Sequence, residues 1–163
     1  MKDFKIENLA NNEMFITTFT CALTIAIRNH QEEKIEALRN AVLNTALINS
    51  TEEEDLHLMF LNFVDAFTPW HIRILVFFNN PKEYCQKNGI NVSSLVAGPQ
   101  SSVLEQAFRS LTQDFYDQIT RDLNDRGLAF DVASLHALTE ELFGPRTTPM
   151  GKRFLEFISA PRI

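Results

Sequence analysis

The sequence contains few of the residues that interrupt regular structure, and little cysteine. Five Gly and six Pro in 163 residues argue against a loop-rich or disordered chain and favour long regular elements. Two cysteines form no Cys-x-x-Cys motif and follow no secretory pattern, so we expect a reducing, cytoplasmic setting. The longest apolar run, Met14 to Ile27, has 14 residues including four Thr, fewer than the roughly 20 that a transmembrane segment needs.

Motifs of the common catalytic and ligand-binding classes are also absent. The chain has no Gly-x-Gly-x-x-Gly, no phosphate-binding Gly-rich loop ending in Lys-Ser/Thr, no His-Glu-x-x-His and no Gly-x-Ser-x-Gly. Glu54 and His57 match one Glu-x-x-His of a di-iron bundle, but a second one is missing. His136 and Glu140 are spaced for a shared metal without a third ligand nearby. We therefore expect no enzyme, no metal site and no cofactor.

The two cysteines predict different surroundings. Cys21 lies within an apolar helical pattern and is expected to be inert packing. Cys85 lies between Lys82 and Lys87, so we expect it to be the more exposed thiol and somewhat activated. No base or oxyanion site accompanies either thiol in the sequence.

The net charge of −6 lies entirely in the first part of the chain. Residues 1–67 hold five Lys and Arg against eleven Asp and Glu, whereas residues 68–163 hold ten of each kind. An acidic first half would be repelled by phosphate backbones and anionic lipid. A nucleic-acid role is therefore disfavoured by charge and would have to lie in the second half.

Apolar periodicity predicts helices through residues 12–67. Phe15, Phe19, Leu23 and Ile27 recur at every fourth position and predict a buried first helix. Asn29 with Glu32 has the pattern of a capping box opening a second helix, whose expected apolar face is Ile35, Leu38, Val42 and Ala46. Ser50 with Glu53 would open a third helix, which carries Leu56, Met59, Phe60, Phe63, Val64 and Phe67.

Cap signals mark the later helices. Thr68 and Pro69 predict the start of a mostly buried fourth helix. Asn80, Pro81 and Glu83 predict a short fifth helix closed by Gly89, and Ser102 with Glu105 predicts another. The pattern continues after Thr112 through Phe115, Ile119 and Leu123 to Gly127. Residues 128–130 could form a short strand, residues 134–143 are an ambiguous helix, and Thr148-Pro149 begins a last helix with Phe154, Leu155 and Ile158.

The last fifty residues resemble a winged-helix module. The likeness rests on residues 114–126, the following Gly127-Leu128-Ala129-Phe130, and the segment from Thr147 to Ile158 with its Thr-Pro-x-Gly-x-x-Phe-Leu pattern. The resemblance implies a recognition helix, a wing and a closing helix. It also implies candidate nucleic-acid or partner contacts at Arg121, Arg126, Arg146, Lys152 and Arg153. Residues 114–126 carry a net charge of −2, however, whereas a DNA-reading helix normally brings several Lys or Arg.

A second resemblance covers the segments Glu33 to Asn44 (EKIEALRNAVLN) and Phe67 to Leu75 (FTPWHIRIL). They are similar to a group of uncharacterised bacterial helical proteins, and no function comes with that likeness. It implies a bacterial cytoplasmic or membrane-associated setting. It also leaves open the alternative that Met1 begins a fragment of a longer protein. Trp70 and His71 are candidates for a partner contact, with core packing as the alternative.

Together these patterns predict an all-α protein. We expect an acidic helical hairpin over residues 12–67, packed on a winged-helix-like half over residues 68–163 with at most a small two-stranded wing. The expected role is a non-catalytic protein-interaction or regulatory module, self-associating into a homo-oligomer through the first helix, whose apolar residues are hard to cover in one small chain. The alternative is a DNA-binding winged-helix transcriptional regulator.

Overall fold

The structure, a computed structural model, describes residues 6–47, 53–90, 107–108, 110–130 and 144–161. These residues are mostly helical, which confirms the predicted all-α class. No helix among them is long and apolar enough to cross a bilayer. The helix predicted over residues 134–143 lies outside the described residues, and so does most of the helix predicted from Ser102.

The chain divides into two compact units. Unit 1 comprises Met1–Pro69 together with Arg153–Ile163, and unit 2 comprises Trp70–Lys152. The last helix therefore begins in unit 2 and ends in unit 1. The sequence-based domain ranges 12–67 and 68–163 stay a prediction.

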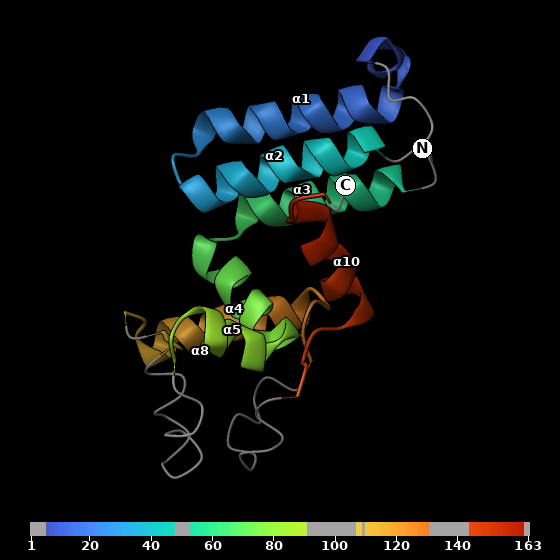
Figure 1. The fold of residues 1–163 in the computed structure, drawn as a ribbon. Coiled ribbons are helices and arrows are strands. Elements are labelled where there is room, and N and C mark those ends of the chain that lie inside the picture. Colours follow the sequence, from blue (N-terminus) through green and yellow to red (C-terminus); the bar gives the residue numbers. More distant parts are fainter. Residues whose placement is uncertain (1–5, 48–52, 91–106, 109, 131–143, 162–163) are drawn as a thin grey trace. The chain divides into compact units, whose positions relative to one another are not determined.

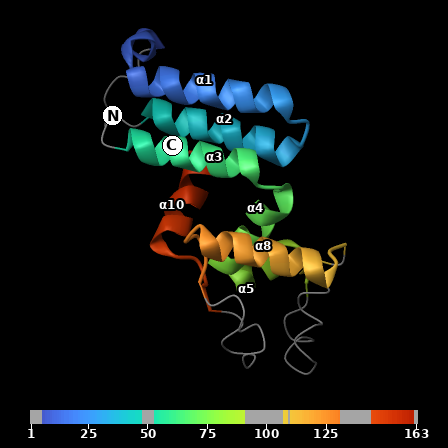
Figure 2. The same cartoon turned by 180° about the vertical axis from the view of Figure 1, so that it is seen from behind.

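Unit 1 is built on a layer of three helices, α1 (Glu13–Arg28), α2 (Glu32–Leu47) and α3 (Glu54–Ala66), preceded by the 3-10 helix η1 (Ile6–Asn11). The three lie side by side in both views (Figures 1 and 2). The last turns of α10 (Pro149–Ile158) complete the core of unit 1, because the Phe154 ring contacts three other phenylalanine rings edge-on. These are Phe60 and Phe63 of α3 and Phe67, which follows it.

The face of α1 that points inward differs from the predicted one. Met14, Thr18, Ala22 and Ile25 are buried, whereas Phe19, Leu23 and Ile27 are exposed and Phe15 is half-buried. The prediction of a helix buried through Phe15, Phe19, Leu23 and Ile27 is therefore wrong. The inward face carries small side chains at Thr18 and Ala22, and α1 packs against α2 and α3 through that face.

The start and the buried face of α2 also differ from prediction. Asn29 closes α1, since its backbone N–H donates to Ala26 and its side chain to Ile25. Helix α2 then starts at Glu32, with the carbonyl of Gln31 accepting its first hydrogen bonds. Its buried residues are partly polar. They are Lys34, Ala37, Leu38, Asn40, Ala41 and Thr45, while Ile35 is exposed.

Unit 2 contains α4 (Pro69–Asn79), α5 (Pro81–Lys87) and α8 (Gln113–Asp125). The predicted starts of α4 and α5 are confirmed, and Asn80 caps α5 by accepting from the N–H of Glu83. Gly89 ends α5 with a φ of 65°, the left-handed conformation that glycine adopts without strain. The unit's core combines aliphatic residues with four aromatic ones. The aromatic residues are Phe77, Phe78, Phe108 and Tyr116.

The chain after α8 turns sharply and returns beside itself. Gly127 ends the helix with a φ of 67°, as predicted, and Ala129 forms an isolated antiparallel bridge with Thr147. Thr148 then caps α10, because its hydroxyl accepts from the N–H of Gly151 at 2.9 Å and donates to the carbonyl of Gly127 at 2.6 Å. The short strand that the sequence suggested over residues 128–130 is therefore reduced to this one bridge at Ala129.

Candidate functional site

The first candidate site is a row of exposed apolar side chains on α1, which we call the α1 stripe. Its members are Ile16, Phe19, Leu23 and Ile27, exposed to 46%, 48%, 50% and 72%. Spacings of three and four residues place them on one side of a helix. Single exposed apolar residues are ordinary, whereas a contiguous apolar row on a surface commonly marks an interaction site.

The α1 stripe is also free of charge. Glu13 and Arg28, at the two ends, are the only charged residues of α1. Arg28 donates to the carboxylate of Asp65 on α3 at 2.8 Å. Between these ends, 14 consecutive uncharged residues give the face no like-charge barrier to an apolar partner.

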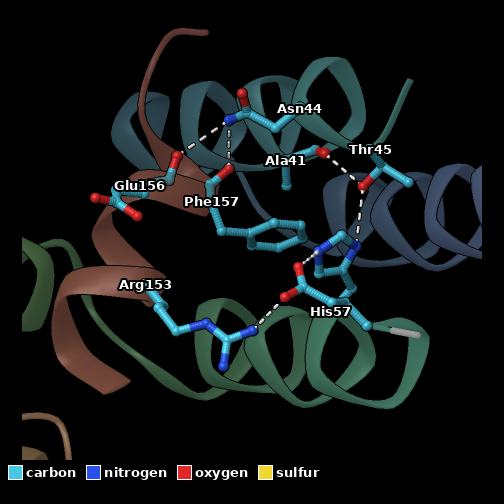
Figure 3. Close-up of polar contacts among 8 residues, drawn as sticks. Ala41, Asn44, Thr45, His57, Arg153, Glu156 and Phe157 are labelled. Atoms are coloured by element: carbon cyan, nitrogen blue, oxygen red, sulfur yellow. Dashed lines mark hydrogen bonds and ion pairs between the residues drawn. The ribbon is translucent and has the colours of Figure 1, made fainter. Parts of the chain in front are cut away.

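The second candidate site, which we call the polar clamp, consists of Asn40 and Asn44 of α2 and the carbonyls at the end of α10 to which their side chains donate (Figure 3). The side-chain amide of Asn44 donates to the carbonyls of Glu156, Phe157 and Ser159 at 3.1, 2.8 and 2.8 Å. One turn earlier, buried Asn40 donates to the carbonyl of Ile158 at 3.1 Å. The last carbonyls of a helix have no partner within it, so the two asparagines act together as a C-terminal cap supplied by another helix.

His57 of α3 lies beside this clamp and is buried (Figure 3). Its Nδ1 is 3.3 Å from the hydroxyl of Thr45, and that hydroxyl donates to the carbonyl of Ala41 at 2.9 Å. Since the hydroxyl hydrogen is used on Ala41, its oxygen accepts from His57, which assigns the Nδ1–H tautomer to the neutral ring. The ring also contacts that of Phe157, with centroids 4.5 Å apart.

The electrostatics around His57 favour its neutral form. Burial lowers the pKa of His57; the nearby carboxylate of Glu53 opposes this shift and the guanidinium of Arg153 adds to it. The second ring nitrogen, Nε2, lies 3.7 Å from Glu53, and Glu53 is bonded to Arg153 of α10. A proton taken up at low pH would therefore go to Nε2, facing Glu53. Glu53, and not the Glu54 of the Glu-x-x-His spacing, is therefore the carboxylate that the structure places at His57.

The basic candidates from the sequence are scattered. Arg121, Arg126 and Lys152 are exposed in unit 2, whereas Arg146 is buried there, with only 6% of its surface exposed. Arg153 belongs to unit 1, where it pairs with Glu53. On α8, Arg121 shares its exposed face with three aspartates. These are Asp114, Asp117 and Asp125.

Trp70 and His71 both pack inside unit 2. The Trp70 ring meets Phe108 edge-on at 6.2 Å, and Arg73 stacks over it at 4.7 Å. His71 is buried, with Nε2 3.3 Å from the carboxylate of Asp122. The burial of His71 fits the core-packing alternative that the sequence left open, whereas Trp70 is only half-buried.

The described residues offer little nucleophilic or metal-binding chemistry. Cys85 is fully buried and Cys21 is half-buried, the reverse of the predicted order. Burial raises the pKa of both thiols, which disfavours the reactive thiolate. Within the described ranges no three His, Cys, Asp or Glu side chains come together as metal ligands. His136 and Glu140 lie outside these ranges.

The sequence predicted that α1 is an apolar helix. It predicted neither which face of α1 is exposed nor the polar clamp. The clamp residues Asn40 and Asn44 lie i, i+4 on a helix that also buries Lys34 and Thr45 among its apolar residues. Polar residues at or beside the buried face of a helix are the signal that a sequence offers for a shared polar partner. The acceptors are backbone groups 112 to 118 residues away, and backbone groups carry no sequence signature.

No family model, curated protein or solved structure matches this chain.

Proposed function

We propose that this protein is a non-catalytic protein-interaction or regulatory module that self-associates through the α1 stripe. The observation that carries the proposal is the exposure of four large apolar side chains along one uncharged helix face. The outward face of α1 holds four large apolar residues, while its inward face holds two large ones, Met14 and Ile25, and two small ones, Thr18 and Ala22. This distribution is typical of a helix with a second packing partner.

The energy available fits a weak, reversible dimer. Complete burial of a Leu, Ile or Phe side chain contributes about 1.5–3 kcal/mol, and about half of each stripe side chain is still exposed. Covering the stripe on both copies, eight side chains that are about half exposed, therefore contributes about 6–12 kcal/mol. Association costs about 4 kcal/mol or more in lost freedom, which leaves at most about 8 kcal/mol, so we expect a dissociation constant of about 1 μM or weaker.

The setting and the finer fold belong to the same proposal. We place the protein in the bacterial cytoplasm because of the resemblance of its Glu33 to Asn44 segment and the absence of paired cysteine motifs. Unit 2 is proposed as a degenerate winged-helix module. The glycine turn after α8 and the bridge between Ala129 and Thr147, at the position of a wing, support this.

DNA binding by unit 2 is the competing function. It would use the exposed Arg121, Arg126 and Lys152, but the acidic surface of α8 opposes approach to phosphate. Retention of the protein on duplex DNA at low salt would support this alternative. Loss of that retention in a triple Arg121, Arg126 and Lys152 to Ala variant would assign it to these residues.

Sedimentation equilibrium of the full chain tests self-association. We expect the mean mass to rise from 18.7 kDa toward twice that value between about 10 μM and 1 mM protein. Leu23→Glu should remain monomeric, because a carboxylate would be buried in the apolar contact. Thr24→Glu is the matched control, since Thr24 is exposed on α1 outside the stripe, and it should dimerise like the wild type. A monomer at all concentrations would refute the proposal.

A further inference from the structure

We infer that the occupant of the α1 stripe is the same stripe of a second copy, running antiparallel across a two-fold axis near residue 21. This inference rests on the self-association proposed above and specifies its geometry. It depends on three features of α1: the order of its apolar residues, the placement of its two charges and its direction.

The stripe is self-complementary when one copy is reversed. Ile16 then lies opposite Ile27 of the second copy, and Phe19 lies opposite Leu23. The midpoints of these two pairs are positions 21.5 and 21. They differ by half a residue, which is less than the rise of about 1.5 Å per residue of a helix. One axis therefore brings all four side chains into contact, as an isologous two-fold interface requires.

The charges at the ends of α1 follow the same symmetry. Glu13 and Arg28 have their midpoint at position 20.5, so reversal places each Glu13 at about the same level along the helix pair as an Arg28 of the second copy. Arg28 already donates to Asp65 through one terminal nitrogen, and a guanidinium has five N–H donors. A parallel pair would instead bring Glu13 to Glu13 and Arg28 to Arg28. It would also align the two helix dipoles, which is unfavourable.

Cysteine cross-linking distinguishes the two directions. Ile16→Cys and Ile27→Cys are made separately in a Cys21→Ser chain, in which the remaining Cys85 is fully buried. One variant carries a mass tag. The two variants are mixed and mildly oxidised. An antiparallel pair then gives a disulfide between the tagged and the untagged chain, in a yield several-fold higher than that of the homodimeric disulfide of either variant alone. Thr24→Cys, exposed on α1 outside the stripe, sets the level due to random collision.

The outcomes separate this inference from the proposed function. Homodimeric disulfides of Ile16→Cys and of Ile27→Cys, without excess in the mixture, would show a parallel pair and overturn the inference while self-association stands. Dimers in sedimentation whose cross-linking does not exceed the Thr24→Cys level would place the interface off the stripe and overturn it too. A chain that is monomeric in sedimentation would refute the proposed function, and the inference with it.

Discussion

The polar clamp predicts a loss of stability whose magnitude can be worked out from the structure. Asn40 is buried, and its amide donates to the carbonyl of Ile158 at 3.1 Å. Asn40→Ala removes this donor and leaves a helix-end carbonyl without a partner. A buried polar group left unsatisfied costs about 1–3 kcal/mol. We expect the free energy of unfolding of unit 1 to fall by that amount.

Asn44 provides a graded comparison within the same clamp. It is half-buried and two of its three acceptors are near solvent, so water can replace part of what Asn44→Ala removes and the loss should be about 0.5–1.5 kcal/mol. Asn44→Asp should cost about 0.3–1 kcal/mol more than Asn44→Ala, because a carboxylate beside the negative end of α10 is repelled. The expected order of stability is therefore wild type, Asn44→Ala, Asn44→Asp.

Urea unfolding followed by far-ultraviolet circular dichroism measures these differences. All variants are made in the Leu23→Glu chain, so that self-association does not contribute to stability. Asn62→Ala is the control, because Asn62 is an exposed asparagine of α3 in the same unit. A midpoint for Asn40→Ala equal to that of Asn62→Ala, at an unchanged slope, would refute the capping role of α2.

Three further predictions concern stability. Gly151→Ala should destabilise the protein by about 1–3 kcal/mol in thermal or urea unfolding, because its Cβ would overlap the backbone oxygen of Leu128. Phe154→Ala should cost about 3–5 kcal/mol, since the ring is fully buried among three others. Stability should fall as the pH drops below about 6.5, because the folded state holds His57 below its ordinary pKa while the unfolded state takes up the proton. His57→Gln should flatten the stability profile below about pH 6.5, and an unchanged slope would exclude His57 as its cause.

Helix starts that depend on adjacent residues could be predicted from the sequence. Asn80 with Pro81 and Thr148 with Pro149 place a side-chain acceptor and a residue without an N–H where the first helical turn needs them. Gly127 and Gly89 could be predicted in the same way, because few residues other than glycine adopt a positive φ without strain. These are local requirements, so they do not depend on what the helix packs against.

The choice of the inward face of α1 could not be predicted, because apolar residues occur around most of that helix. The large apolar residues Phe15, Phe19, Leu23 and Ile27 follow the helical period most clearly, so we expected them to be buried. The structure places Met14, Thr18, Ala22 and Ile25 inward instead. Which face packs depends on the shapes of the neighbouring helices, and periodicity does not describe shape. The same limit applies to Asn40, whose acceptor lies 118 residues away.

Side-chain labelling by hydroxyl radicals at several protein concentrations tests self-association through α1 most directly. We predict that Phe19, Leu23 and Ile27 are labelled freely in dilute protein and become protected as the concentration rises through the dissociation constant. Phe115 and Phe130 of unit 2, exposed to 39% and 47%, serve as internal references and should keep constant labelling. Equal labelling of the stripe at every concentration would contradict the proposal that this face binds a second copy.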